Sequence, residues 1–341
     1  MWFGIKALDD AGGVIGATLA HSVKLDSGLR LRKGHVITGE DVQRLRREGV
    51  AEITVAIRDA GDLMEDEAAA RIADVLEREE LRRDDVGTGR VNLYSRVGGV
   101  LLVDAPSIER TNRIDPAITV ATLANHSVVR PGQMVATVKI IPFAVAGAKV
   151  DEARSELSPG GALCVQAFRE GFRVALIQTR VPGTRESVLD KTRETTASRL
   201  DALDADLAGE ARCAHTSADV ASKLASGLAA TDMAIVFGAS AMTDARDVVP
   251  AAIEEAGGEL IYVGMPVDPG NLLVLGEIGG KPVIGAPGCA RSPKENGFDW
   301  VLQRLCAGMD LTGDDIVAMG VGGLLSEIPL RPHPRETGAK R

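Results

Sequence analysis

Between residues 172 and 308 the chain alternates short apolar runs with segments of helical periodicity. The first run, FRVALIQT, is almost continuously apolar, as parallel strands buried on both faces are. Repeated alternation of this kind predicts an α/β fold with an open, mostly parallel sheet flanked by helices. The expected strands are 172–179, 211–216, 232–238, 259–264 and 280–288, and the expected helices are 187–207, 217–231, 247–258 and 296–308. Ligands of such sheets bind beyond the carboxyl ends of the strands, so we expect a site at that edge.

A smaller, strand-rich α+β region precedes the sheet. Two apolar stretches surround a turn at 26–28, and Thr38 with Asp41 three residues later predicts the capped start of a helix. Ser217 is the expected N-cap of a helix in the later α/β region. The chain therefore begins with a region of mixed helices and strands that differs in rhythm from the rest.

Residues 146–166 change to small and polar types, with Ser-Pro-Gly-Gly at 158–161, and this change predicts a domain boundary. The predicted organisation is an amino-terminal region 1–150 with sub-units 1–58 and 59–150, a linker 151–166, the main domain 167–330 and a polar tail 331–341.

Charge and cysteine content exclude several classes of function. The net charge of −9 argues against a general nucleic-acid binder. The four cysteines lie far apart without CxxC spacing, which predicts neither a zinc site nor a disulfide framework and favours the cytoplasm. We find no secretory signal and no run of apolar residues long enough to span a membrane.

The loops expected at the carboxyl ends of the strands carry most of the polar chemistry. The small residues at 238–241 would let backbone N–H groups approach a ligand. A Gly/Pro turn feeding the helix at 296–308 is suited to an anion, because free N–H groups and the helix dipole would face it. A nucleophilic Cys289 and a plain tight connection are the alternatives for that turn. The candidate binding residues are Thr179, Gly238, Ala239, Ser240, Asp244, Asp268, Asn271, Pro287, Gly288, Cys289, Ala290, Arg291 and Ser292.

Three further groups need a choice between roles. Asp247 is either a helix cap or a catalytic carboxylate that holds Mg²⁺ on a nucleotide. Arg180 and Arg185 either pair with an anionic ligand or are solvated. His215 ends a predicted strand and is a possible substrate contact, whereas His21, His35 and His126 lack metal-ligand spacing. No motif supports a catalytic pair of Cys289 and His215.

Common nucleotide and hydrolase motifs are missing from the sequence. It contains no G-x-G-x-x-G dinucleotide fingerprint feeding a helix from a strand, no P-loop and no G-x-S-x-G elbow. The commonest dehydrogenase, kinase and hydrolase classes are therefore excluded.

Two longer motifs carry a family resemblance over residues 170–325. FGASAMTDARDVVPAAI and GKPVIGAPGCARS resemble, in order and spacing, the molybdopterin-binding domain of molybdopterin adenylyltransferases, molybdenumtransferases and gephyrin. The chain is most similar to a bacterial subgroup often fused to, or accompanying, a molybdenum cofactor nucleotidyltransferase. The resemblance implies the molybdopterin-binding fold, molybdopterin as ligand or substrate, Mg²⁺ and ATP for any transfer reaction, and that nucleotidyltransferase as partner. A homo-oligomer is also expected.

This sequence departs from the family pattern at several positions. Ala239 and Ala241 replace loop glycines, and Cys289-Ala290 replaces Asn-Pro. An acidic residue expected near 215–217 is missing, which favours a binding protein over an enzyme. The alternatives are an active molybdopterin adenylyltransferase or molybdenumtransferase and, from another class, an unrelated nucleotide-binding α/β protein.

Overall fold

The computed structural model describes residues 1–9, 13–157, 161–268 and 270–325. Two compact units divide the chain, one with residues 1–97 and 101–165 and the other with residues 98–100 and 166 onward. The predicted polar tail lies outside the described residues. Within the described ranges, every helix is too short or too polar to cross a membrane.

The first part of the first unit is a small antiparallel sheet with one helix and its own hydrophobic core. Its strand order is β1-β5-β2, and β3 and β4 form a separate hairpin. Gly28 allows that hairpin's turn with a φ of 85°. The elements are β1 (Trp2–Ala7), β2 (Thr18–Leu19), β3 (Val23–Lys24), β4 (Arg30–Leu31), α1 (Gly39–Arg47) and β5 (Glu52–Ile57).

Helix α1 begins with the capping box that the sequence predicts. The Thr38 hydroxyl accepts a hydrogen bond from the Asp41 N–H, and the Asp41 carboxylate accepts one from the Thr38 N–H at 2.9 Å. His35 also contacts that carboxylate, with Nε2 2.7 Å from Oδ2. Val42 and Leu45 then reach the core, so the cap and the buried face together fix the helix.

The second part of the first unit packs three helices and several short strands around another core. Its largest sheet has the order β10-β12-β8-β7 with antiparallel neighbours. Smaller sheets are β11-β9-β14 and β13-β6. The elements are β6 (Asp62–Met64), α2 (Glu65–Asp74), β7 (Leu81–Arg83), β8 (Arg90–Ser95), β9 (Gly99–Val103), α3 (Ala105–Ile114), β10 (Ile118–Thr122), β11 (Val128–Val129), β12 (Met134–Ile140), β13 (Ala144–Ala146), α4 (Gly147–Leu157) and β14 (Leu163–Ala167).

The expected linker 151–166 is instead mostly regular structure. Helix α4 continues to Leu157 because Val150, Ala153 and Leu157 recur on one face and are buried. Strand β14 follows from Leu163. Residues 158–160, where the Ser-Pro-Gly-Gly run begins, lie outside the described part.

The second unit is the α/β sheet that the alternation predicts. Its strand order is β16-β15-β17-β20-β19-β18, and β16, β15, β17 and β20 are parallel neighbours. Strand β19 runs antiparallel to both β20 and β18. The elements are β15 (Phe172–Arg180), α5 (Glu186–Asp201), β16 (Ala205–Ala214), α6 (Ser217–Leu228), β17 (Met233–Phe237), α7 (Val248–Glu255), β18 (Glu259–Met265), β19 (Asn271–Ile278), β20 (Lys281–Ala286), α8 (Gly297–Cys306) and α9 (Gly313–Ala318).

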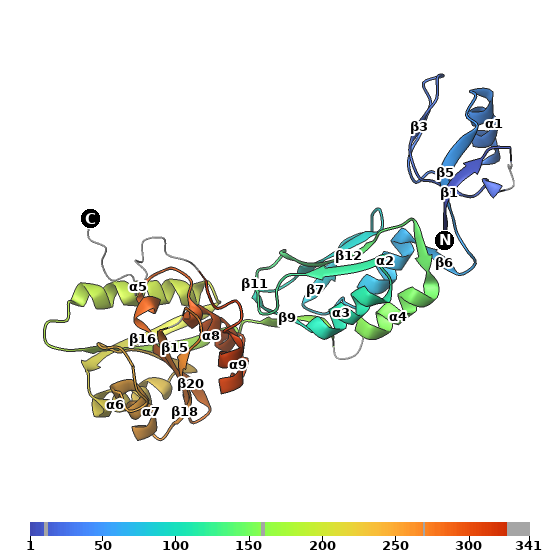
Figure 1. The fold of residues 1–341 in the computed structure, drawn as a ribbon. Coiled ribbons are helices and arrows are strands. Elements are labelled where there is room, and N and C mark those ends of the chain that lie inside the picture. Colours follow the sequence, from blue (N-terminus) through green and yellow to red (C-terminus); the bar gives the residue numbers. More distant parts are fainter. Residues whose placement is uncertain (10–12, 158–160, 269, 326–341) are drawn as a thin grey trace, which may run out of the picture. The chain divides into compact units, whose positions relative to one another are not determined.

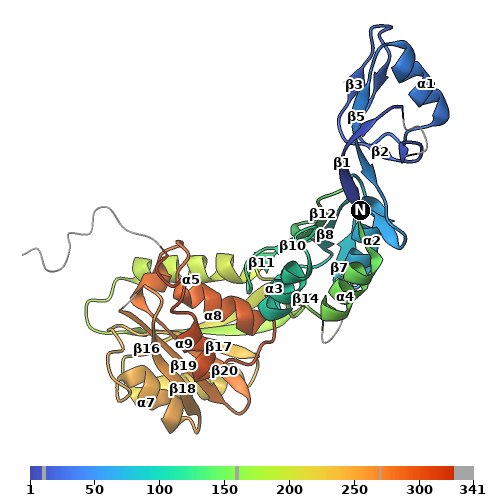
Figure 2. The ribbon, with the colours of Figure 1, turned by 45° about the vertical axis from the view of Figure 1, so that its right-hand side comes forward.

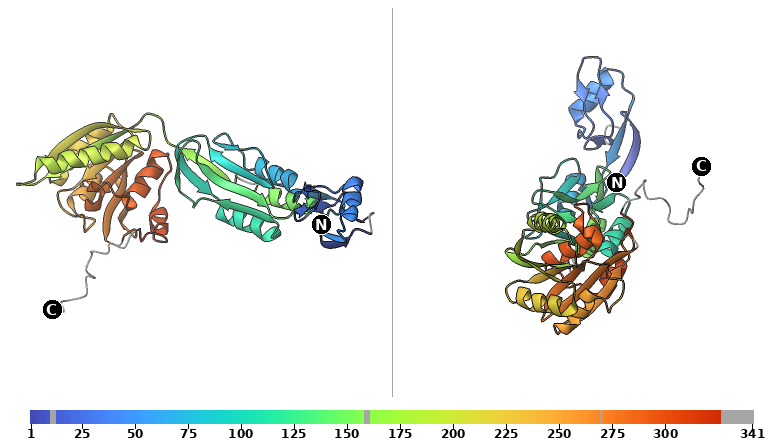
Figure 3. Two further views of the ribbon diagram at one scale, coloured as in Figure 1. Left: turned by 90° about the horizontal axis from the view of Figure 1, so that it is seen from above. Right: turned by 90° about the vertical axis from the view of Figure 1, so that its left-hand side faces the viewer.

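Helices cover both faces of this sheet. Helices α5 and α8 lie on one face, and α6 and α7 lie on the other (Figures 1 and 2). The view from above shows α5 running over the strands (Figure 3). The central strand β17 is buried at every position, which explains its unbroken apolar sequence. The prediction of a mostly parallel, helix-flanked sheet is confirmed.

Several element boundaries in the α/β unit differ from the prediction. Helix α5 ends at Asp201, and β16 begins at Ala205, so the expected helix 187–207 is too long and the expected strand 211–216 too short. Asp204 has a φ of 54°, a conformation that ends helical geometry. The N-cap of α6 is Thr216, not Ser217, because its hydroxyl accepts from the Asp219 N–H.

The capping box of α1 gives a test of the first core. Burial raises the pKa of Asp41, but hydrogen bonds from His35 and Thr38 outweigh it and hold the pKa below its ordinary value. Asp41→Ala should lower the free energy of unfolding of this part by about 1–2 kcal/mol at pH 7. The carboxylate contributes above its unfolded pKa and loses its effect as the pH falls, so the difference should shrink below about pH 4.

Urea unfolding followed by Trp2 fluorescence, in a Trp300→Phe background, measures this effect because the chain has two tryptophans. The exposed neighbour Glu40 is the control, and Glu40→Gln should change stability by less than about 0.5 kcal/mol. An Asp41→Ala difference that persists unchanged to pH 3 would contradict the role of the carboxylate.

Candidate functional site

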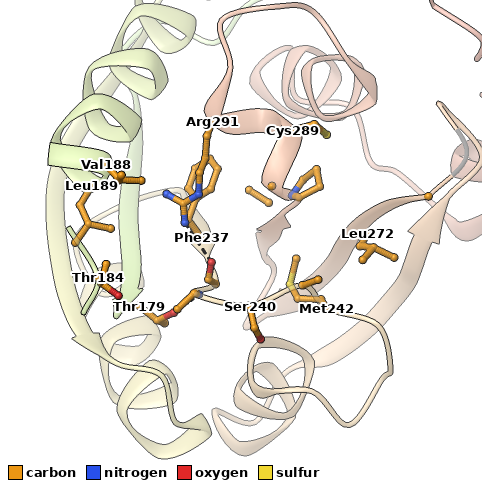
Figure 4. A pocket seen from close by; sticks show the side chains of 17 residues that line it. Thr179, Thr184, Val188, Leu189, Phe237, Ser240, Met242, Leu272, Cys289 and Arg291 are labelled. Carbon is orange, nitrogen blue, oxygen red and sulfur yellow. Dashed lines mark hydrogen bonds between the residues drawn. The ribbon is translucent and has the colours of Figure 1, made fainter. Parts of the chain in front are cut away.

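A cavity of about 500 Å³ opens at the carboxyl ends of β15, β17 and β20 (Figure 4). The 238–242 loop, the first turn of α5 and the start of β19 complete its walls. It therefore lies at the edge that the strand–helix alternation indicates. The sequence-predicted residues that line it are Thr179, Gly238, Ala239, Ser240, Pro287, Gly288, Cys289 and Arg291.

Part of the cavity wall is apolar. Val188 and Leu189 contribute from α5, and Phe237, Met242 and Leu272 from the sheet side. The sequence does not predict these five residues as part of a site, because apolar side chains next to a strand end are typical of the hydrophobic core. Such a wall suits the body of a ring-containing ligand.

Gly285 lies in β20 where the strand passes Met242. A Cβ at this position would be 2.9 Å from Cβ of Val274 and 3.0 Å from Sδ of Met242. Glycine is therefore required here by close packing, and it lets Met242 pack against the strand.

Arg291 reaches into the cavity from a short 3-10 helix, Gly288–Arg291 (Figure 4). Its Nη1 donates to Oγ1 of Thr192 at 2.7 Å, and its Nη2 donates to the Gly238 carbonyl at 3.1 Å. The guanidinium also lies over the Phe237 ring, 4.8 Å from its centre. Within the described part of the chain, no carboxylate forms an ion pair with it, and burial lowers its pKa.

Two polar residues, Gln178 and Thr192, form hydrogen bonds with Arg291. The sequence did not predict either of them as part of the site. Both are buried. Oε1 of Gln178 lies 3.4 Å from Nη1 of Arg291, and its Nε2 donates to Oε1 of Glu210 and to the Leu189 carbonyl, each at 2.9 Å. The available signal was a single glutamine inside the apolar run FRVALIQT.

Arg199 fixes the loop that follows Arg291. From α5 its guanidinium donates to the carbonyls of Ala290 at 2.8 Å, Ser292 at 2.6 Å and Lys294 at 3.3 Å. It also forms an ion pair with Asp299, with Nε 2.6 Å from Oδ1, and both side chains are about nine-tenths buried. The predicted residues Ala290 and Ser292 thus serve through their carbonyls as attachment points of the loop.

His215 joins two strand ends at the rim of the cavity. Its Nδ1 lies 2.9 Å from Oγ1 of Thr179, and its Nε2 lies 3.0 Å from Oγ of Ser240. The Ala239 N–H donates to the same Thr179 hydroxyl at 2.7 Å. His215 does not itself line the cavity, but it ties the 238–242 loop to the end of β15.

The acidic residues of the loop before α7 are engaged with the loop itself. Oδ2 of Asp247 accepts from the N–H groups of Thr243 at 2.6 Å and Asp244 at 3.1 Å. Asp247 occupies the N-cap position of α7, yet its side chain forms no cap hydrogen bond. Asp244 pairs with Arg246, which lowers its pKa to about 2. Neither aspartate lines the cavity, so magnesium at Asp247 stays a prediction.

The remaining predicted residues lie outside the cavity wall. Asp268 has a φ of 45°, and its Oδ1 accepts from the Leu325 N–H at 3.2 Å. Asn271 is 5% exposed, and its amide nitrogen and oxygen are without hydrogen-bond partners among the described residues. Arg180 pairs with Glu186 at 3.3 Å. Arg185 is the exposed N-cap residue of α5.

Cys289 is exposed on the cavity side of its turn, but its environment does not favour a thiolate. Desolvation raises its pKa, although nearby backbone N–H groups act in the opposite direction. Its Sγ is 3.9 Å from Oδ1 of Asn296. The pairing with His215 finds no support in the contacts, since that imidazole bonds Thr179 and Ser240 instead. In residues 1–9, 13–157, 161–268 and 270–325, no three His, Cys, Asp or Glu side chains are grouped to hold a metal ion.

The comparisons with known proteins are distant. A family model described as a domain of unknown function, DUF8806, matches residues 10–57, and no curated protein matches the chain. Among solved structures, the chain is similar to a molybdopterin biosynthesis MoeA protein from Pyrococcus horikosii, with 14% identity over 90% of this chain and 75% of that one, at a TM-score of 0.31. It is also similar to a molybdenum cofactor biosynthesis protein from Pyrococcus furiosus, with 10% identity over 93% of this chain and 65% of that one, at a TM-score of 0.23.

Replacing Arg199 should destabilise the α/β unit strongly. Arg199→Ala leaves the buried Asp299 carboxylate and several carbonyls without their donor, which should cost about 3–5 kcal/mol. Urea unfolding followed by Trp300 fluorescence in a Trp2→Phe background measures the loss. Arg185→Ala, on the exposed turn before the same helix, is the control and should change stability by less than about 0.5 kcal/mol. Equal effects of the two substitutions would contradict the clamping role.

Thiol labelling tests the chemistry of the turn. At pH 7.5 Cys289 should react with iodoacetamide more slowly than free cysteine, because its raised pKa leaves less thiolate. Its rate should increase about tenfold per pH unit until the pH passes its pKa. Cys306, whose burial raises its pKa to about 12, should stay unlabelled until the protein unfolds. Mass spectrometry of labelled peptides gives both rates, and a Cys289 rate above that of free cysteine would restore the nucleophile hypothesis.

Proposed function

We propose that this protein binds molybdopterin in the cavity at the carboxyl ends of β15, β17 and β20. The pterin phosphate would lie against Arg291 and the 287–291 turn, and the ring system against the 238–242 loop. The observation that carries the proposal is the half-buried guanidinium of Arg291, which faces this cavity with hydrogen bonds to neutral acceptors.

A cation in this position favours an anionic ligand on physical grounds. Burying a charge is costly unless a partner of opposite charge is supplied. Thr192, Gln178 and the Gly238 carbonyl orient the guanidinium, but they leave its charge uncompensated. A phosphate monoester would supply the counter-charge through short charge-assisted hydrogen bonds, for which arginine is well suited.

The size and lining of the cavity support a ligand that combines a phosphate with a ring. A volume of about 500 Å³ falls within the range of small-molecule sites. The apolar side chains of Met242 and Leu272, beside the 238–242 loop, give a surface for an aromatic ring system (Figure 4). Among phosphorylated ring compounds, the motifs at 237–253 and 280–292 favour molybdopterin, through the family resemblance that they carry.

Binding and delivery suit the site better than transfer chemistry. Asp247 accepts hydrogen bonds from its own loop, and Asp244 is paired with Arg246. The protein would then hold molybdopterin for maturation or for delivery to a molybdenum cofactor nucleotidyltransferase. The alternative is a molybdopterin adenylyltransferase or molybdenumtransferase that uses Mg-ATP or molybdate through Asp247.

Arg291→Met tests the binding site. Loss of a charge-assisted bond worth about 1.5–3 kcal/mol should raise the Kd for molybdopterin by roughly tenfold to 150-fold. Anaerobic calorimetry, with the fluorescence of oxidised pterin as a second measure, gives the Kd. Arg246→Ala removes an equal charge from the adjoining loop outside the cavity and should change the Kd by less than about threefold. Wild-type protein that binds neither molybdopterin nor inorganic phosphate would refute the proposal.

A turnover assay separates binding from transfer. Wild-type protein incubated with molybdopterin, Mg²⁺ and ATP should release neither pyrophosphate nor AMP above the buffer rate. Release that disappears in Asp247→Ala would replace the binding role with that of a transferase. Asp244→Asn is the control, because it alters the same loop while leaving the Asp247 carboxylate in place.

A further inference from the structure

Gln178 occupies a buried position between a carboxylate and a cation. On one side its Nε2 donates to Oε1 of Glu210 at 2.9 Å. On the other side its Oε1 faces Nη1 of Arg291 at 3.4 Å. The side chain is completely buried, so solvent does not intervene in these contacts. The amide orientation is set by chemistry, since the NH₂ must face the carboxylate and the oxygen must face the guanidinium.

The charge of Glu210 is balanced from other directions. Nε of Arg212 pairs with its Oε1, and Nε of Arg193 lies 3.5 Å from its Oε2. Arg212 also pairs with Glu186 and Asp190, at 2.6 Å each. The charges of this cluster are therefore compensated within it, and the side chain of Gln178 lies between the cluster and Arg291.

Arg199 provides the contrast. It lies on the same helix as Thr192 and is more deeply buried than Arg291, and it pairs directly with Asp299. At Arg199, whose role is to hold the loop after Arg291, the carboxylate of Asp299 compensates the buried charge. At Arg291 a neutral glutamine stands where a carboxylate would fit.

We propose that Gln178 is a positioning residue for anion binding, which orients Arg291 without supplying the counter-ion that it also lacks among the other described residues. This rests on the proposed function, because it assigns the charge of Arg291 to a phosphate-bearing ligand. A glutamate at position 178 has nearly the same shape but would satisfy the guanidinium from within. The bound anion would then lose its partner, and the Leu189 carbonyl would lose the donor that Nε2 of Gln178 supplies.

The binding test uses inorganic phosphate and molybdopterin as probes in a buffer without sulfate. Because a carboxylate introduced at position 178 would also face Glu210, the informative variant is the double substitution Gln178→Glu/Glu210→Gln, which removes that repulsion. Calorimetry should give a Kd for each probe at least about tenfold above wild type for the double variant. Glu210→Gln alone is the matched control and should stay within about threefold of wild type. A double variant that binds as tightly as Glu210→Gln overturns the proposal and leaves the proposed function intact.

Wild type that binds neither probe refutes the proposed function and, with it, this proposal. A ligand-free measurement tests the electrostatic premise separately from binding. Arg291→Met is introduced into both Glu210→Gln and Gln178→Glu/Glu210→Gln, and urea unfolding is followed by Trp300 fluorescence in a Trp2→Phe background. Pairing of the introduced carboxylate with Arg291 predicts that Arg291→Met changes the unfolding equilibrium constant at least about tenfold more in the second background. Additive effects, within about twofold, would show that a carboxylate at position 178 does not neutralise Arg291 and would overturn the proposal.

Discussion

The shape of the cavity at the 287–291 turn depends on the hydrogen bonds and the ion pair formed by the guanidinium of Arg199. It joins α5 to the carbonyls of Ala290, Ser292 and Lys294 and to the carboxylate of Asp299 at the start of α8. From the turn itself, Arg291 adds hydrogen bonds to Thr192 and to the Gly238 carbonyl. Because one buried cation gathers these acceptors, the turn presents Arg291 and Cys289 to the cavity in a defined conformation.

Two arginines of the same unit are therefore stabilised in opposite ways. Arg199 is compensated by a carboxylate and serves the fold, whereas Arg291 is held by neutral acceptors and faces open space. Gln178 and Thr192 cost little in stability, because each is hydrogen-bonded despite being buried. On the proposed function, the amide of Gln178 in place of a carboxylate leaves the charge of Arg291 available to a ligand.

Much of this arrangement follows from the sequence, but not all of it. Strand–helix alternation predicted the sheet and the edge at which the cavity opens, and glycine and proline at 285–288 predicted the turn that carries Arg291. Periodicity did not reveal the end of α5, because Asp204 stops the helix through its backbone conformation while Leu203 and Leu207 continue a helical pattern. Arg199 and Gln178 were missed since their partners lie far along the chain. The sequence predicts Asp247 as a possible helix cap. Only the folded loop shows that its carboxylate accepts hydrogen bonds from the N–H groups of Thr243 and Asp244.

Because β19 runs antiparallel to β20, the cavity walls are formed by opposite ends of their strands. The parallel strands reach the cavity with their last residues, whereas β19 reaches it with its first ones, and Gly270 and Leu272 line the cavity there. A connection that enters an antiparallel strand can change in length without shifting the pairing of its parallel neighbours. A change in length before Asn271 would therefore alter one wall of the cavity while the pairing of β15, β17 and β20 stays the same.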